Sequence, residues 1–502
     1  MDQEKEQPYK QKPSTLTNQM EKNIKLIKSI FENDQTLLVR HIENRFSPSI
    51  QCAIIYTDGM VNNKLLNEDV IKPLLECRIR GTEQEAIDVI AKQIITCDSA
   101  EKTSDMDKIL QGIVYGDSVL LLEGCDQALI LNTKGWTSRA INEPESERVI
   151  RGPREGFNEA LMTNLSLLRR RIRTPDLKME FQVFGTTTQT KACLCYVDGI
   201  VNKDVLAELK KRLKSISIDG VLDTNYISEL IKDAPYSPVK TIGSTEKPDI
   251  VAARLLEGRV ALLLDGSPVV LTLPYLFIEN FQSDEDYYLN FYFASLNRII
   301  RLIAFFLGTS LPGIYIALVT FHQEILPTPL LMSISMARQS VPLPTALEAA
   351  LMLLVFEMLR ESGSRMPGSM GQALSIVGAL VIGQASVEAK LVSAPMVIIV
   401  GLTGISGLMT PRIKGADILL RFSFLICCSI LGLYGYVFGV FAFLIHLYST
   451  NSFGVPIMNS ATENSQQDKK DIAIRSPWWV MRKRPKFLSP NRVRSNSRRN
   501  GS

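Results

Sequence analysis

Three long runs without Asp, Glu, Lys or Arg constrain this chain more than any other feature. Residues 302 to 321, LIAFFLGTSLPGIYIALVTF, would form an uncharged helix about 30 Å long, which matches the thickness of a bilayer core. Two further runs cover residues 391 to 411 and 422 to 448. Helices buried in a soluble core rarely stay uncharged beyond about 14 residues, so these runs predict insertion in a membrane.

The uncharged runs are confined to the C-terminal part of the chain. The whole sequence of 502 residues is 46% hydrophobic and 22% charged, with a net charge of +4, but both kinds of residue are mixed as far as about residue 295. We therefore expect a soluble part followed by an α-helical polytopic membrane domain. The polar start MDQEKEQPYKQ lacks the apolar core of a signal peptide, and Arg298 and Arg301 precede the first run. Both features predict a cytoplasmic soluble part.

Two motifs recur in the soluble part. AIIYTDGMVN (53 to 62) returns as CLCYVDGIVN (193 to 202), and GDSVLLLEG (116 to 124) returns as GRVALLLDG (258 to 266). Each copy reads as an apolar strand, an Asp-Gly turn and a helix, and it closes with two strands. The prediction is an α/β region of two similar duplicated subdomains.

No group of residues in the sequence indicates catalysis. Four carboxylates belong to the repeated turns and are predicted to shape them: Asp58, Asp198, Glu123 and Asp265. Cys193 and Cys195 align with Ala53 and Ile55 of the first copy, so they are predicted to be core residues of a strand. The eight cysteines have neither disulfide nor metal spacing, and the three histidines, His41, His322 and His446, are scattered. We therefore expect no enzyme activity, no metal and no cofactor.

An arginine-rich segment lies between the copies. Phe157, Leu161, Leu165, Leu168 and Ile172 form a helical apolar stripe within residues 147 to 180. Four arginines gather at its C-terminal end: Arg169, Arg170, Arg171 and Arg173. A nucleic-acid surface is one interpretation, but no aromatic platform accompanies the arginines. A helix that links the subdomains or docks a neighbouring subunit is favoured, with no nucleic-acid partner.

These patterns predict six regions. They are an N-terminal arm (1–47), a first α/β subdomain (48–140), an Arg-rich helical linker (141–188), a second α/β subdomain (189–282), a multi-helix membrane domain (283–462) and a basic cytoplasmic tail (463–502).

Six stretches carry a resemblance to a known family: VIRGPREGFNEALMTNLSLLRRRI, STEKPDIVAARLLEGRVALLLDGSP, TFHQEILPTPLL, VPLPTALEA, SIVGALVIGQA and SFGVP. In this order they resemble the A subunit of the GerA-type spore germinant receptors, from about residue 50 to about residue 490. The resemblance implies a subunit of the spore inner membrane that joins a transporter-like B subunit and a lipoprotein C subunit. It also implies a homo-oligomeric ion channel that opens on nutrient sensing.

Two alternatives accompany this resemblance. A sporulation-specific paralogue group that would amplify ion release shares many of the motifs, although the tail KDIAIRSPWWVMRKRPKF looks more like the receptor branch. A secondary transporter of small solutes is the alternative from another class. An inverted repeat in the membrane half would favour a transporter, and none is found in the sequence.

Residues 341 to 361 place charges in an otherwise apolar segment. Glu348 lies three residues, about 4.5 Å, from the middle of this segment, where an unpartnered charge costs several kcal/mol. Glu357 faces the opposite side and can reach Arg360 one turn on. Pro342 and Pro344 fix the entry of the helix. We expect a helix packed inside an assembly or partly re-entrant, with a partner or water at Glu348; an interfacial amphipathic helix is the alternative.

The following helix, residues 371 to 390, is the predicted pore helix. Its small and weakly polar residues would permit close packing between helices: Ser375, Ala379, Gly383 and Gln384. Val377 and Val381 are the apolar candidates for a dewetted constriction. Close packing without a pore predicts the same small residues.

The number of membrane passes stays open between four and six. Residues 466 to 502 carry eleven lysine or arginine residues against two aspartates, which favours the cytoplasm. Five passes would place this tail outside; four with a re-entrant segment, or six with 422 to 458 split in two, keep it inside. Trp478 and Trp479 in the basic tail are typical of a surface that contacts anionic membrane lipid.

Overall fold

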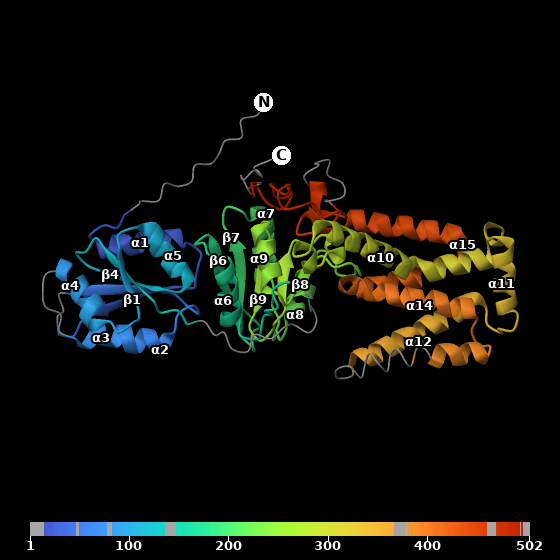
Figure 1. Cartoon of the computed structure of the whole chain (residues 1–502), viewed down its shortest axis with the longest axis horizontal. Helices are drawn as coiled ribbons and strands as arrows, with labels where there is room; N and C mark the ends of the chain where they lie inside the picture. Colours follow the sequence, from blue (N-terminus) through green and yellow to red (C-terminus); the bar gives the residue numbers. More distant parts are fainter. Residues whose placement is uncertain are drawn as a thin grey trace, which may run out of the picture. The chain divides into compact units, whose positions relative to one another are not determined.

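The computed structural model divides the chain into two compact units. It describes residues 15–46, 50–77, 83–135, 147, 149, 151–365, 378, 381–458, 468–491, 493 and 494. The sheet unit comprises Met1–Lys232, Ile242–Pro274 and Lys483–Arg494, and the helical unit comprises Asp233–Thr241, Tyr275–Arg482 and Ser495–Ser502 (Figure 1).

The first half of the sheet unit is a five-stranded antiparallel sheet with the order β1-β2-β4-β5-β3. Its strands are β1 (Leu37–Glu43), β2 (Gln51–Thr57), β3 (Ala100–Thr103), β4 (Ser118–Leu122) and β5 (Ala128–Leu131). Its helices are α1 (Met20–Ile30), α2 (Asn63–Leu65), α3 (Lys72–Glu76), α4 (Glu83–Val89) and α5 (Met106–Tyr115), with π-helical turns at Leu66–Ile71 and Ile90–Ile94.

The second half has the same strand order, β6-β7-β9-β10-β8. Its strands are β6 (Leu177–Phe184), β7 (Thr190–Val197), β8 (Gly243–Thr245), β9 (Val260–Leu264) and β10 (Val270–Leu273). Its helices are α6 (Leu161–Arg171), α7 (Lys203–Lys214), α8 (Thr224–Ile231) and α9 (Pro248–Leu256). Element for element, each half runs from a helix through two strands, a helical segment, a strand and a helix to two final strands.

The recurring motifs form equivalent turns in the two halves. Gly59 and Gly199 take φ values of +77° and +74° between a strand and a helix, a conformation in which glycine carries no steric cost. The next helix then begins at an asparagine cap: the side chains of Asn62 and Asn202 each accept two backbone N–H groups of the first turn. The predicted Asp-Gly turns therefore lie where the sequence indicated.

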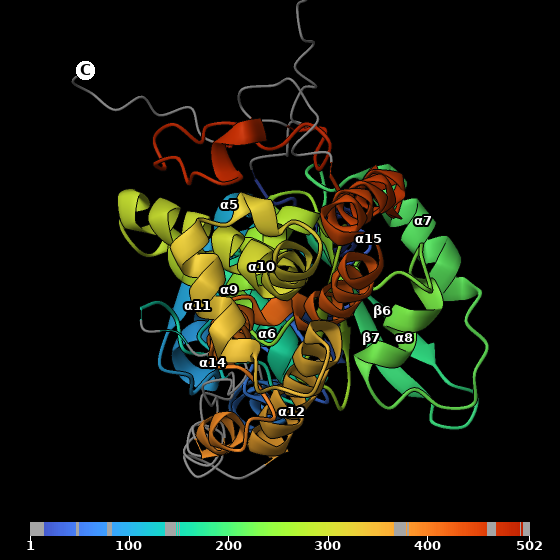
Figure 2. The same ribbon diagram turned by 90° about the vertical axis from the view of Figure 1, so that its right-hand side faces the viewer.

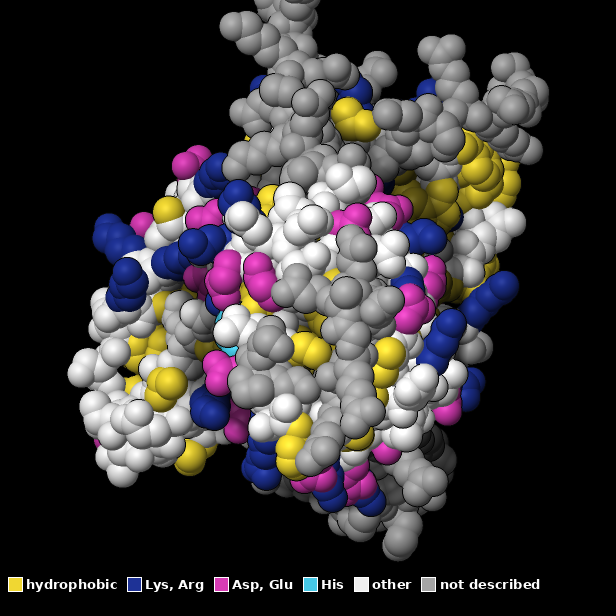
Figure 3. Space-filling model, turned by 90° about the vertical axis from the view of Figure 1, so that its left-hand side faces the viewer, with side chains coloured by type: hydrophobic (Ala, Val, Ile, Leu, Met, Phe, Trp, Pro, Cys, Tyr) yellow, Lys and Arg dark blue, Asp and Glu magenta, His cyan; other side chains and the backbone are white. Residues whose placement is uncertain are grey.

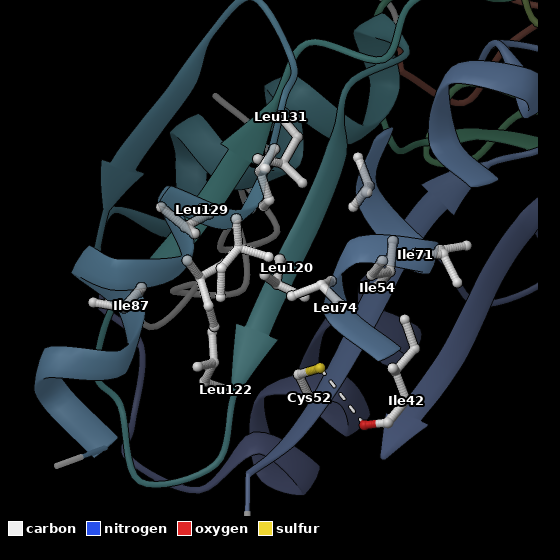
Figure 4. Packing of buried hydrophobic residues seen from close by; sticks show 14 of the residues in the cluster. Ile42, Cys52, Ile54, Ile71, Leu74, Ile87, Leu120, Leu122, Leu129 and Leu131 are labelled. Carbon is white, nitrogen blue, oxygen red and sulfur yellow. Dashed lines mark hydrogen bonds between the residues drawn. The ribbon is translucent and has the colours of Figure 1, made fainter. Parts of the chain in front are cut away.

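The sheets bury continuous apolar strands. All five residues of β4, and all five of β9, are buried, as expected for a strand covered on both faces. One face of the first sheet packs Ile54, Leu120 and Leu129 against Leu74 and Ile87 of its helices (Figure 4). The strong apolar runs of the two recurring motifs thus form the centre of each core.

The boundaries of the two halves differ from the prediction. α1 and β1 fall in the predicted N-terminal arm (1–47), and α6 and β6 fall in the predicted linker (141–188). However, β1 and β6 are strands of the two sheets, and α1 and α6 pack onto their cores. The apolar stripe of α6 packs onto the core of the second sheet, with Leu165 and Leu168 buried there. In β6 the polar residues Lys178, Glu180 and Gln182 alternate with apolar ones, which is a strand pattern that the prediction of a helical linker overlooked.

The predicted tail (463–502) also folds in part. Residues 483 to 494 belong to the sheet unit, and residues 468 to 482 belong to the helical unit. Their many basic side chains made the segment resemble a solvated tail in the sequence.

The helical unit contains long apolar helices. They are α10 (Phe291–Thr320), α11 (Thr328–Arg338), α12 (Thr345–Arg365), α14 (Ala394–Leu408) and α15 (Lys414–Ser449), followed by the strand pair β11 (Asn451–Ser452) and β12 (Val455–Pro456). Within the described residues, two helices are long and apolar enough to cross a membrane, Phe291–Thr320 and Pro411–Ser449. α11 lies crosswise to α10 and exposes Leu330, Met332 and Met336 (Figures 1 and 2).

α15 reverses direction at Gly432, whose φ of +61° and ψ of −140° are not helical. A Cβ atom at Gly439 would lie 2.9 Å from the Phe424 ring, and one at Gly435 would lie 2.1 Å from the Cys427 carbonyl oxygen. In a straight helix, residues 424 and 439 would stand about 22 Å apart. Residues 414 to 431 and 433 to 449 are therefore two antiparallel helices.

Charged side chains cover the sheet unit. Figure 3 shows lysine and arginine interspersed with aspartate and glutamate on one face, with only small apolar areas between them. This mixture is typical of a surface in contact with water.

Candidate functional site

Buried charges gather where α10, α12, α14 and α15 meet. Arg421 of α15 is fully buried and its guanidinium makes three contacts: Nε donates to the Gly308 carbonyl oxygen (2.7 Å), Nη1 to Glu357 Oε1 (2.8 Å) and Nη2 to Asp417 Oδ2 (2.5 Å). Arg360 forms an ion pair with Glu357. We call Glu357, Arg360, Asp417 and Arg421 the Arg421 cluster; its two cations and two anions balance.

Two glycines make room for this cluster. A Cβ atom at Gly308 of α10 would lie 3.2 Å from Asp417 Oδ1, and one at Gly407 of α14 would lie 3.4 Å from Arg421 Nη2. The cluster thus joins four helices through side chains and backbone at close range. A buried ion pair needs such additional hydrogen bonds, because the desolvation of both charges otherwise exceeds their attraction.

The sequence predicted only part of the Arg421 cluster. The contact between Glu357 and Arg360 one turn apart is present in the structure. Asp417 and Arg421 were missed, because both lie just before the uncharged run 422 to 448. The available signal was their spacing of four residues on one helix face.

Glu348 has the partner that its position in the sequence required. Its carboxylate is completely buried, and Oε1 accepts hydrogen bonds from the backbone N–H and the hydroxyl of Ser393, both at 2.6 Å. Ser393 immediately precedes α14, so the carboxylate lies at the positive end of a helix dipole. The carbonyl oxygen of Pro344 accepts the N–H of Glu348 (3.0 Å), and both Pro342 and Pro344 precede α12.

The second carboxylate oxygen of Glu348 faces other polar groups. Arg338 Nε, at the end of α11, lies 4.0 Å from Glu348 Oε2. The Tyr315 hydroxyl on α10 interacts electrostatically with both of these groups. Within the described residues, Arg338 Nε and Glu348 Oε2 have no hydrogen-bond partner. The site links α10, α11, α12 and the start of α14.

Only part of the predicted pore helix can be placed. Ser375, Val377 and Ala379 lie outside the described residues. Residues 381 to 388 are helical; Val381 is 57% exposed, and Gln384 donates a hydrogen bond to Glu388 (3.0 Å). A Cβ atom at Gly383 would lie 3.4 Å from Val397 Cγ1, so this glycine faces α14 at van der Waals distance.

A third group of charges lies at the start of α10. Asp286 is fully buried between Arg298 Nε (2.8 Å) and Arg301 Nη2 (2.9 Å), and Arg298 Nη1 also contacts Asp471 Oδ1 (2.7 Å). Burial acts to raise the pKa of Asp286, but the hydrogen bonds from the two arginines outweigh it and lower this pKa. Trp478 packs near Tyr287, with ring centroids 5.9 Å apart.

The four repeated carboxylates stabilise backbone turns. Asp58 and Asp198 accept the N–H of the glycine that follows each of them (2.9 and 3.0 Å). Glu123 accepts the N–H at the start of α1, and Asp265 accepts the N–H at the start of α6. Asp58 and Asp198 thus shape their turns as predicted, whereas Glu123 and Asp265 accept the first N–H groups of helices that lie far away in the sequence.

The cysteines and the possible metal-binding side chains are further candidates for a chemical site in the part of the chain that the structure describes. All eight cysteines are free, and burial raises the pKa of the Cys193 thiol. Among the described residues, no three His, Cys, Asp or Glu side chains are grouped for a metal ion.

The chain matches one family model and several known protein sequences over most of its length. The model "Bacillus/Clostridium GerA spore germination protein" matches residues 25–487. "Spore germination protein KA" of Bacillus subtilis (strain 168) is 41% identical over 486 residues, covering 96% of this chain and 89% of the relative. "Uncharacterized membrane protein YfkQ" of the same organism is 40% identical, covering 89% and 87%.

One solved structure is also similar. It is the crystal structure of the N-terminal domain of the A subunit of the Bacillus megaterium spore germinant receptor GerK3, with 33% identity and a TM-score of 0.43, covering 53% of this chain and 98% of that chain. The family match extends through both the sheet unit and the helical unit. This chain belongs to the GerA family of spore germination proteins.

Proposed function

We propose that this chain is the A subunit of a nutrient-responsive germinant receptor in the spore inner membrane, and that copies of it assemble around an ion path. The observation that carries the proposal is the family match over residues 25–487, because it includes the sheets and all the long apolar helices. The names of the relatives imply a receptor with several kinds of subunit. Its B and C subunits are the proposed partners, together with membrane lipid.

We infer an even number of membrane passes. α10, α12, residues 371 to 390, α14 and the two halves of α15 would make six passes, with the reversal at Gly432 supplying the sixth. Six passes return the chain to the side of the sheet unit. Residues 483 to 494 pack within the sheet unit, which supports the same conclusion independently. We place both on the cytoplasmic (core) side.

The ion path is proposed along residues 371 to 390. The two cations and two anions of the Arg421 cluster balance. Glu348 accepts two hydrogen bonds from Ser393 and lies 4.0 Å from Arg338, so the carboxylates at both sites already have partners within the chain. Val381 remains 57% exposed in the single chain, while Gly383 faces α14. An apolar side chain that is exposed on the surface of a single chain can contact the same side chain of other copies around a symmetry axis. Together these side chains can form a dewetted constriction.

Deletion of the gene tests the proposal. Spores without this chain should lose the response to one nutrient class, measured as potassium release and loss of refractility, and should keep the response to nutrients that other receptors sense. Restoring the gene should restore the response. Slower germination with every nutrient would instead indicate a paralogue that amplifies ion release, and unchanged germination with all nutrients would refute a receptor role.

A further inference from the structure

The two halves of the sheet unit cover their Asp-Gly turns in different ways. In the first half, the residues directly after β5 lie on the turn: Asn62 N donates to the Thr133 carbonyl oxygen (2.7 Å), and Gly135 N donates to the Met60 carbonyl oxygen (3.1 Å). Val61 and Lys134 form a β-bridge between these contacts. In the first half, the Asp-Gly turn is therefore covered by residues 133 to 135, which directly follow β5 in the sequence.

In the second half, the chain after β10 is not available for this role. The chain leaves the sheet unit after Pro274, and Tyr275–Arg482 belong to the helical unit. The C-terminal segment, which we define as residues 483 to 494, takes the same place. Ser489 Oγ donates to the carbonyl oxygen of Ile200 (2.6 Å), the equivalent of Met60, and Asn202 Nδ2 donates to the Phe487 carbonyl oxygen (3.2 Å).

The C-terminal segment is folded on itself. Lys483 and Val493 form a β-bridge that closes it into a loop. Inside the loop, Arg484 Nη1 donates to the carbonyl oxygens of Asn491 (3.2 Å) and Val493 (2.6 Å). Its Nε donates to the Leu256 carbonyl oxygen (2.6 Å) at the end of α9. A peptide that holds its own bound shape loses less entropy on binding.

The receiving surface fits this loop closely. Gly258 has a φ of +99°, and a Cβ atom there would lie 2.6 Å from the Leu488 carbonyl oxygen and 2.8 Å from Ser489 Cβ. Leu488 and Ser489 are each only 1% exposed. At the edge of this surface, Arg494 Nη2 lies 3.1 Å from Glu257 Oε1.

We propose that residues 198 to 202 and 254 to 258 form a peptide-docking groove, and that the C-terminal segment is its exchangeable occupant. The groove takes a basic peptide that is closed into a loop and whose central Leu-Ser pair passes over Gly258. This inference stands on contacts within the sheet unit and does not depend on the proposed function.

Hydrogen exchange on the intact chain tests docking. Gly258→Ala should speed amide exchange in residues 485 to 491 about tenfold or more, since the added methyl displaces the segment. Gly116→Ala is the matched control: Gly116 is the equivalent glycine, with a φ of +93°, and its Cβ atom would meet only Met60 of the turn, with the carbonyl oxygen 2.9 Å away. Equal acceleration of residues 485 to 491 by both variants would overturn the proposal.

A peptide titration tests exchange. A chain that ends at Arg482 should bind a fluorescent peptide of residues 483 to 494 saturably, and the intact chain should bind it at least tenfold more weakly because its groove is filled. Ser489→Ala in the peptide should weaken binding, and Gly258→Ala in the truncated chain should abolish it. Equal binding by both chains, no binding by the truncated chain, or failure of the truncated chain to fold would each refute an exchangeable occupant.

Discussion

Arg421 is the residue on which the buried charges of the helical unit converge. Replacing it with Met should destabilise the purified protein by about 3–5 kcal/mol, because Glu357 and Asp417 lose their shared cation. The double variant Arg421→Met with Asp417→Asn should recover part of this loss. Thermal unfolding in detergent measures both. A double variant that is less stable by the sum of the single effects would contradict the coupling.

Glu348 stabilises the start of α14 through its two hydrogen bonds with Ser393. Glu348→Ala removes the acceptor for Ser393 N and Oγ and should cost about 1–3 kcal/mol, whereas Glu348→Gln retains an acceptor oxygen and should cost less. Leu347→Ala, at a neighbour that is 58% exposed, is the control. The unfolding midpoint of each variant is the measurement, and equal midpoints for the Ala and Gln variants would contradict this account.

Glu257 makes docking of the C-terminal segment dependent on pH. Burial acts to raise its pKa, but Arg259, Arg494 and Arg254 outweigh burial and lower it. Of these three arginines only Arg494 belongs to the C-terminal segment, so only its part of the lowering depends on docking. The contribution of the Glu257–Arg494 pair to docking is fully present above the pKa of Glu257 in the undocked chain, and it is lost as the pH falls through the further lowered pKa of the docked chain. Peptide affinity for the truncated chain should fall in that acidic range, and Glu257→Gln should remove the dependence. If Glu257→Gln keeps the same dependence of peptide affinity on pH, a group other than Glu257 causes that dependence.

At the scale of elements, the backbone conformation of Gly432 lets the second half of α15 run antiparallel to the first half. A Cβ atom at Gly432 would lie 2.8 Å from His322 Cε1 and 2.9 Å from Phe321 Cβ, in a backbone conformation that only glycine adopts readily. Gly432→Ala should therefore lower the amount of folded protein, while Gly401→Ala, with nothing within 4 Å, should not. Membrane fractions probed with a C-terminal tag provide the measurement. Equal yields would show that the reversal tolerates a side chain.

The sequence predicted elements whose pattern is local. The Asp-Gly turns and the apolar strands of both motifs could be identified because each is a short continuous signal. The docked C-terminal segment could not be identified, since its partner lies far away in the sequence: Ser489 contacts Ile200 across 289 positions. The signal for β6 was local and was overlooked, because β6 pairs with the next strand, β7, and its apolar and polar residues alternate. Only the local part of the Arg421 cluster could be identified from the sequence. Its Glu357–Arg360 pair is local, and its contact with Arg421 is not.

At the scale of the whole molecule, the two sheets have equal strand order, and their equivalent turns are covered in different ways. The family match spans the sheet unit and the helical unit. The proposed function assigns contacts on the cytoplasmic side to the sheet unit and the ion path to the helices.

Potassium flux tests this account most directly. Liposomes loaded with potassium would contain the purified receptor complex with this chain, without it, or with Val381→Ala. We predict efflux that requires both the nutrient and this chain, and efflux without nutrient from the Val381→Ala complex, because a smaller side chain widens a dewetted constriction. Nutrient-dependent efflux that persists when this chain is omitted would contradict the account.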